Sequence, residues 1–90
     1  MSYNKFLKTH NLLNKILEML IYFNIIEKNK DFKYIKYKIK TKMKEPDFIE
    51  TIAKLFERKY NKCRSIELKC NLKNLIDELN FAKQYLEKES

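Results

Sequence analysis

Residues 35–44 read Ile-Lys-Tyr-Lys-Ile-Lys-Thr-Lys-Met-Lys, a strict alternation of lysine with apolar or neutral residues. Successive side chains of a β-strand point to opposite faces, so a period of two is typical of a strand. One face of such a strand would pack on a core, and the other would hold five ammonium groups in a row. The alternation therefore predicts an exposed, lysine-rich strand in the middle of the chain.

In a strand that begins at residue 32, Phe32 and Tyr34 share a face with Lys36 and the lysines that follow it at even positions. Ammonium groups neutralise phosphates and aromatic rings stack on bases, so such a face is typical of modules that bind single-stranded RNA. The predicted nucleic-acid-binding residues are this face and the adjacent lysines: Phe32, Lys33, Tyr34, Lys36, Lys38, Lys40, Lys42 and Lys44.

The net charge of +8 is concentrated in this part of the chain. Residues 28–44 contain eight lysines and one acidic residue, Asp31, for a net charge of +7, which leaves 12 basic and 11 acidic residues elsewhere. A local concentration of this kind favours a binding surface for a polyanion over a generally basic surface. A protective role is the competing interpretation, because lysines on an exposed strand also oppose edge-to-edge aggregation.

Three helices are predicted from capping residues and from the helical spacing of apolar residues. Ser2 is a suitable N-cap for a helix that begins near Tyr3. Pro46, at a first helical position and followed by Asp47, marks the start of a second helix. Asn71 can cap a third helix that continues toward the C-terminus. Each helix has an apolar stripe, so we expect all three to cover one face of a sheet.

Two further segments are predicted strands. Residues 19–26 are apolar on every side and rich in β-branched and aromatic residues, and residues 64–70 alternate as the lysine segment does. The predicted fold class is α+β, with three helices packed on one face of a small, two- or three-stranded sheet, in the order α-β-β-α-β-α, within a single domain of residues 1–90. The alternative order is α-β-α-β-α, in which residues 19–26 extend the first helix to about Lys28.

The predicted order of elements is similar to that of KH-like and ferredoxin-like RNA-binding modules of ribosomal proteins. A KH module is marked by a GxxG loop, whereas this chain has no glycine, so the resemblance covers element order alone and assigns no residues. The absence of glycine also means that the turns have to use Asn or Asp, or be longer.

No catalytic, metal or cofactor site is predicted. Cys63, Cys70 and His10 supply too few soft ligands for a four-ligand zinc site, and we expect the two thiols to be reduced in an intracellular protein. Asn14 and Lys15 interrupt the N-terminal apolar run, which argues against a signal peptide or a membrane span. The motifs of phosphate loops and common hydrolases are absent, so we expect neither an enzyme nor a small-molecule substrate.

The sequence therefore predicts a small basic protein that binds nucleic acid, RNA rather than DNA, and that is a candidate subunit of a ribonucleoprotein particle. The alternative is a protein-interaction module, such as a phage-type inhibitor, an accessory subunit of a larger assembly or a homodimer. Its predicted partner-binding residues are Phe81 and Tyr85, which lie one turn apart on the side of the third helix opposite its apolar stripe.

Overall fold

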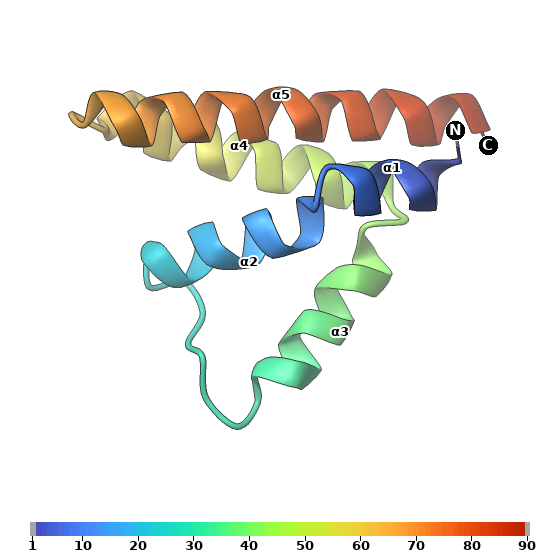
Figure 1. Ribbon diagram of the computed structural model, residues 1–90, viewed down its shortest axis with the longest axis horizontal. Coiled ribbons are helices and arrows are strands. Elements are labelled where there is room, and N and C mark those ends of the chain that lie inside the picture. Colours follow the sequence, from blue (N-terminus) through green and yellow to red (C-terminus); the bar gives the residue numbers. More distant parts are fainter. Residues whose placement is uncertain (1, 90) are drawn as a thin grey trace.

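The computed structural model describes residues 2–89, and this part of the chain consists of helices with no strand (Figure 1). The five helices are α1 (Tyr3–Thr9), α2 (Leu12–Tyr22), α3 (Phe32–Lys42), α4 (Pro46–Lys62) and α5 (Ile66–Glu89). The predicted α+β class, with the order α-β-β-α-β-α, is therefore wrong, and so is the alternative order α-β-α-β-α. The similarity in element order to KH-like and ferredoxin-like modules does not hold either, because it depended on those strands.

The scaffold of the fold is an antiparallel pair formed by α4 and α5, which lie side by side along their length (Figure 1). Each helix contributes one apolar stripe whose residues recur every three or four positions, as a packed helix requires. The buried residues of the two stripes are Ile49, Ile52, Ala53 and Phe56 of α4, and Leu72, Leu75, Ile76, Leu79 and Ala82 of α5.

An ion pair on the surface also joins the two helices of the scaffold. The Glu50 carboxylate of α4 lies 3.4 Å from Lys83 Nζ of α5, and 3.4 Å from Lys54 Nζ on its own helix. The charge of Lys54, followed by that of Lys83, lowers the pKa of the Glu50 carboxyl. Because this cluster is solvated, the buried stripes rather than the ion pair hold α4 against α5.

The first two helices pack against α5 and are separated by a sharp turn at Asn11. Asn11 and Asn24 both have positive φ angles, of 51° and 59°. Asn24 closes α2 with the hydrogen-bond pattern of a Schellman motif, since its N–H donates to the Ile21 carbonyl and the Ile25 N–H donates to the Leu20 carbonyl. The expectation that asparagine replaces glycine in the turns is confirmed at these two positions.

Two of the predicted strands are parts of helices and turns. Residues 19–22 form the last turn of α2, because the chain stays helical until the Asn24 turn ends it. Residues 66–70 form the first turns of α5, and Ser65 caps them by accepting a hydrogen bond from the Leu68 N–H at 3.3 Å. Ile66 is 86% exposed, so the alternation in residues 64–70 does not correspond to a buried strand face.

The lysine segment forms α3 and the turn that follows it. Its inward residues are the half-buried Phe32 and Ile35 and the buried Ile39 and Met43, which are spaced by three, four and four positions. This spacing gives one face of a helix, and lysine is a good helix former. The predicted strand of residues 35–44 is wrong because only alternate members of its apolar face are buried.

The C-terminal end of α3 is held in place by Tyr3. The Tyr3 side chain is buried, and its hydroxyl donates a hydrogen bond to the backbone carbonyl of Met43, just after α3. The Tyr3 N–H donates to Glu89 Oε1 at 3.0 Å, which joins the start of α1 to the end of α5. Burial, and to a smaller degree the charge of Glu89, raises the pKa of Tyr3 to about 12.

Replacing Tyr3 with phenylalanine tests this contact. We expect Tyr3→Phe to lower the free energy of unfolding by about 1–2 kcal/mol near neutral pH, because the Met43 carbonyl loses its buried donor. The folded-state pKa of Tyr3 lies above its ordinary value of 10, so the stabilisation is complete below that pH and is lost as the pH rises toward 12. Urea unfolding between pH 10 and about 12 should show the difference in free energy of unfolding between the two proteins becoming smaller as the pH rises. A difference that stays constant with pH would contradict this role of the Tyr3 hydroxyl.

Candidate nucleic-acid interface

The helix α3 projects from the rest of the structure. Figure 1 shows it running away from the α4–α5 pair, with the loop of residues 23–31 at its far end. Its closest helical neighbour is α2, and Ile39 is its only buried residue within the helix. Most of the surface of α3 is therefore available to a partner.

The side chains of α3 are arranged symmetrically about Ile39. Successive residues of a helix are about 100° apart, so residues one or three positions from Ile39 lie on the two flanks, and residues two positions away lie on the far side. All the flanking positions are lysines. We define the first lysine row as Lys33, Lys36 and Lys40, the second lysine row as Lys38 and Lys42, and the tyrosine strip between them as Tyr34, Tyr37 and Thr41.

The tyrosine strip faces solvent along the middle of the exposed surface. Tyr34 is 62% exposed and Tyr37 is 67% exposed. The Thr41 hydroxyl donates to the Tyr37 carbonyl at 3.0 Å, which leaves its oxygen able to accept another hydrogen bond. Tyr37 and Thr41 were not among the predicted site residues, although their spacing of three and four positions from Tyr34 is a helical signal.

The helix separates residues that the strand prediction had placed on one face. Phe32 packs against the core, with Lys28 Nζ 6.0 Å from its ring centre, so its ring does not continue the exposed surface. Lys36 and Lys38 lie on opposite flanks of α3 rather than in one row. The remaining predicted lysines are all exposed, and Lys44 lies beyond the end of the helix.

No lysine of residues 28–44 has an acidic partner in the part of the chain that the structure describes; the ion pairs there involve other residues. Lys38 Nζ lies 5.4 Å from the ring centre of Tyr34, and Lys42 Nζ lies 5.9 Å from that of Phe48. These cation–π contacts leave the ammonium charges in place. Because lysines also face each other four positions apart on both flanks, α3 carries an unneutralised and self-repelling charge.

A second group of basic residues surrounds the turn between α4 and α5. Residues 58–73 contain six basic residues and one acidic residue, Glu67, and they include both arginines of the chain. Part of this charge is engaged, since Lys59 Nζ lies 5.3 Å from the ring centre of Phe23 and Lys69 Nζ lies 4.9 Å from that of Tyr60. This group was not among the predicted site residues, because a charge count that separates only residues 28–44 from the rest of the chain does not reveal it.

The two predicted partner-binding residues differ in exposure. Phe81 is 64% exposed, whereas Tyr85 is half-buried and stacks on Phe6, with ring centres 5.7 Å apart. They do not form an exposed aromatic pair, because Tyr85 belongs to the packing between α1 and α5.

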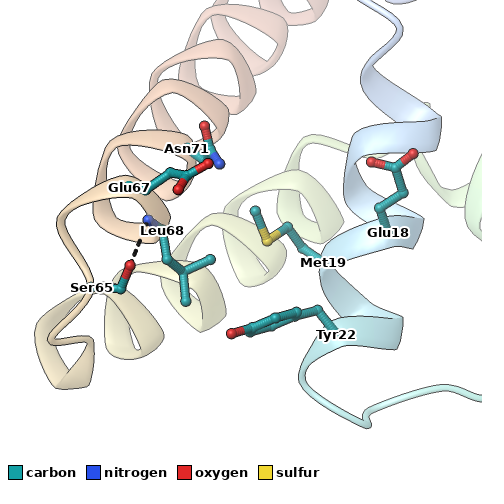
Figure 2. A pocket seen from close by; sticks show the side chains of 7 residues that line it. All are labelled: Glu18, Met19, Tyr22, Ser65, Glu67, Leu68 and Asn71. Atoms are coloured by element: carbon teal, nitrogen blue, oxygen red, sulfur yellow. Dashed lines mark hydrogen bonds between the residues drawn. The ribbon is translucent and has the colours of Figure 1, made fainter.

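An open groove of about 380 Å³ lies between α2 and the start of α5 (Figure 2). Figure 2 shows Met19 and Tyr22 of α2 facing Leu68 of α5 across this groove. Its charged lining residues are Glu18 and Glu67, so the groove is an acidic and apolar surface. It is therefore chemically distinct from the lysine rows of α3.

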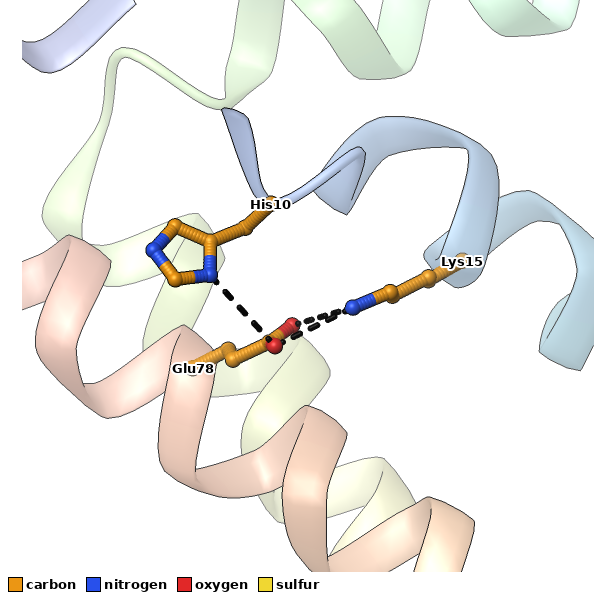
Figure 3. Close-up of polar contacts among 3 residues, drawn as sticks. All are labelled: His10, Lys15 and Glu78. Atoms are coloured by element: carbon orange, nitrogen blue, oxygen red, sulfur yellow. Dashed lines mark hydrogen bonds and ion pairs between the residues drawn. The ribbon is translucent and has the colours of Figure 1, made fainter. Parts of the chain in front are cut away.

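The single histidine belongs to an ion-pair cluster between the turn after α1, α2 and α5 (Figure 3). Glu78 Oε1 lies 3.1 Å from Lys15 Nζ and 3.6 Å from His10 Nδ1. Within residues 2–89, no group of three or more His, Cys, Asp or Glu side chains could hold a metal ion, and Cys63 and Cys70 are free thiols. None of the helices described is long and apolar enough to span a bilayer.

The repulsion within α3 can be tested by changing one charge. Lys36→Glu places a carboxylate within reach of Lys33 and Lys40, so we expect the free energy of unfolding to rise by about 0.5–1 kcal/mol at low salt. Lys36→Gln, which only removes the repulsion, should give about half of this increase. Thermal unfolding in a sodium chloride series should show both differences shrinking as salt screens the charges. Equal stability of the three proteins would contradict the repulsion.

Comparisons with models of protein families, with curated proteins and with solved structures found no match to this chain. The function is therefore inferred from the chemistry of the surface itself.

Proposed function

We propose that this protein binds nucleic acid through α3. The observation that carries the proposal is the exposed charge of this helix: its lysines lie on both flanks, and none has an acidic partner within residues 2–89. A dense row of ammonium groups that the protein itself leaves unneutralised favours a polyanionic partner.

Lysine is a flexible point charge, so the contacts are mainly to phosphates and carry little base recognition. Binding releases counterions from the nucleic acid, which makes the affinity fall steeply with salt. The preference for RNA rested on an aromatic sheet face that the helix does not provide. The choice between RNA and DNA therefore depends on the shape of α3 rather than on stacking.

A protein-interaction module is the second candidate function. It is favoured by the exposed apolar side chains Tyr22, Ile25 and Ile66, of which Tyr22 lines the groove between α2 and α5. An acidic protein could also bind the lysine rows. The two candidates differ in one simple observation, because a nucleic-acid-binding protein purified without nuclease should carry material with a high ratio of absorbance at 260 to 280 nm.

Charge removal on α3 gives the direct test. The combined substitutions Lys36→Gln, Lys38→Gln, Lys40→Gln and Lys42→Gln should weaken nucleic-acid binding by at least about tenfold at low salt. The slope of log affinity against log salt should fall in magnitude by up to about 3.6, since each of the four lost phosphate contacts contributes about 0.7–0.9. Fluorescence anisotropy with labelled nucleic acid at several salt concentrations measures both quantities.

The matched control removes four charges outside α3, by Lys5→Gln, Lys8→Gln, Lys73→Gln and Lys88→Gln. These lysines are exposed and make no ion pair in the described part of the chain. We expect the control to keep most of the wild-type affinity. An equal loss in both proteins would mean that general charge, rather than α3, drives binding. No binding by the wild-type protein at low salt would contradict the proposed function and favour the protein-interaction module.

A further inference from the structure

The dimensions of α3 suit the major groove of B-form DNA. An α-helix with its side chains is about 10–12 Å in diameter, and the major groove is about 12 Å wide and about 8.5 Å deep. With 11 residues, α3 is about 16 Å long, which is enough to follow the groove for several base pairs. Its position at the edge of the structure keeps the α4–α5 pair away from the duplex (Figure 1).

The two lysine rows match the two walls of this groove. A helix lying in the groove has one phosphate backbone on each side, so it needs positive charge on both flanks. Lys38 and Lys40 lie about 100° to either side of Ile39, and Lys36 and Lys42 lie about 60° to either side. The buried face around Ile39 points back to the protein, so all four ammonium groups can reach outward past the two flanks.

The surface between the rows is neutral and suited to base edges. Tyr34 and Tyr37 are exposed, and no other group within residues 2–89 hydrogen-bonds to their hydroxyls. A tyrosine hydroxyl both donates and accepts, and a ring or a threonine methyl group can pack on the methyl group of thymine. The floor of the major groove consists of base edges, and the phosphates lie at its sides. A neutral strip suits this floor, because an ammonium group placed there would have no phosphate to pair with.

Other nucleic-acid forms match this arrangement less well. The major groove of A-form RNA is deep and too narrow for side chains to read, and a single strand has one backbone, which can occupy only one lysine row at a time. We infer that the ligand of α3 is double-stranded DNA, with α3 lying in its major groove. This inference rests on the proposed function, because it specifies the kind of nucleic acid bound at the same site.

The first test compares the two lysine rows. The double variant Lys36→Gln/Lys40→Gln removes two charges from the first row, and Lys38→Gln/Lys42→Gln removes two charges with the same spacing from the second. In the groove both rows contact phosphates, so each variant should bind DNA duplex about threefold to tenfold more weakly and lower the salt slope by about 1–2. A variant that keeps wild-type affinity would overturn the inference, because only one side of α3 would then touch the ligand.

The second test removes the rings of the tyrosine strip. We expect Tyr34→Ala/Tyr37→Ala to weaken binding to DNA duplex about tenfold with an unchanged salt slope, because these side chains contact bases rather than phosphates. Phe81→Ala is the control, since Phe81 is an equally exposed aromatic residue on α5. This variant should bind DNA duplex with the wild-type affinity. Wild-type affinity in the tyrosine variant would place the strip away from the bases and overturn its role. Far-UV circular dichroism spectra of the variants should match that of the wild-type protein, which would show that they remain helical.

The deciding experiment measures the wild-type protein against one sequence in three forms: DNA duplex, RNA duplex and single-stranded DNA, at one salt concentration. The expected result is an affinity for the DNA duplex at least about tenfold higher than for the other two forms. Equal or tighter binding to RNA duplex or single strands would overturn the groove inference while leaving nucleic-acid binding itself supported. Absence of binding to all three would remove both proposals.

Discussion

The packing of the apolar stripes of α4 and α5 is the interaction on which the rest of the structure depends. Phe56, which is completely buried, is the largest residue of the α4 stripe. The helix α5, at about 36 Å, is long enough to support α1 and α2 as well. Together these four helices enclose most of the core. The helix α3 contributes only one buried residue, Ile39, and Met43 follows just after it. The core therefore does not require α3 to lie along the α4–α5 pair, and this helix is free to project.

The projecting helix combines a weak intrinsic stability with a strong charge. An isolated helix of 11 residues is marginal in water, and lysines that face each other along both flanks make it weaker still. Its order therefore comes from tertiary contacts: Ile39 and Met43 in the core, and the Tyr3 hydroxyl on the Met43 carbonyl. A bound polyanion would relieve the repulsion, so ligand binding and the stability of α3 are thermodynamically linked. On the proposed function, the lysines that lower the stability of α3 are also those that would bind the polyanion.

Local signals in the sequence predicted two of the helix starts correctly, because such signals depend on a few neighbouring atoms. Ser2 caps α1 through its side chain, and Pro46 is the first residue of α4. The predicted helix start at Asn71 is wrong, because α5 begins at Ile66 and Ser65 caps its first turn. The strand predictions failed because period and burial are different properties. Residues 19–26 are apolar on all sides, so their pattern cannot distinguish a helix from a strand until the turn at Asn24 is recognised.

The lysine segment shows how one pattern can predict two structures. In a strand, residues 35, 37, 39, 41 and 43 share one face. In a helix, positions four residues from Ile39 lie beside it, positions two residues away lie opposite, and positions one or three residues away lie on the flanks. The informative difference is that Ile35, Ile39 and Met43 are strongly apolar, whereas Tyr37 and Thr41 carry hydroxyls and tolerate water. The location of the charge did not depend on this distinction, but the grouping of residues into rows and a strip did.

The composition of α3 also limits the kind of recognition it can perform. Both arginines of the chain lie near the α4–α5 turn, and α3 contains none. Arginine can make paired hydrogen bonds to guanine, whereas lysine on a flank chiefly fixes the position of a backbone. If α3 binds DNA as proposed, any base preference has to come from the hydroxyls and apolar atoms of Tyr34, Tyr37 and Thr41. These groups can pack on the methyl group of thymine, but they do not specify one base-pair sequence. On the proposed function, a helix built in this way would hold DNA mainly at low salt and would select sequence only weakly.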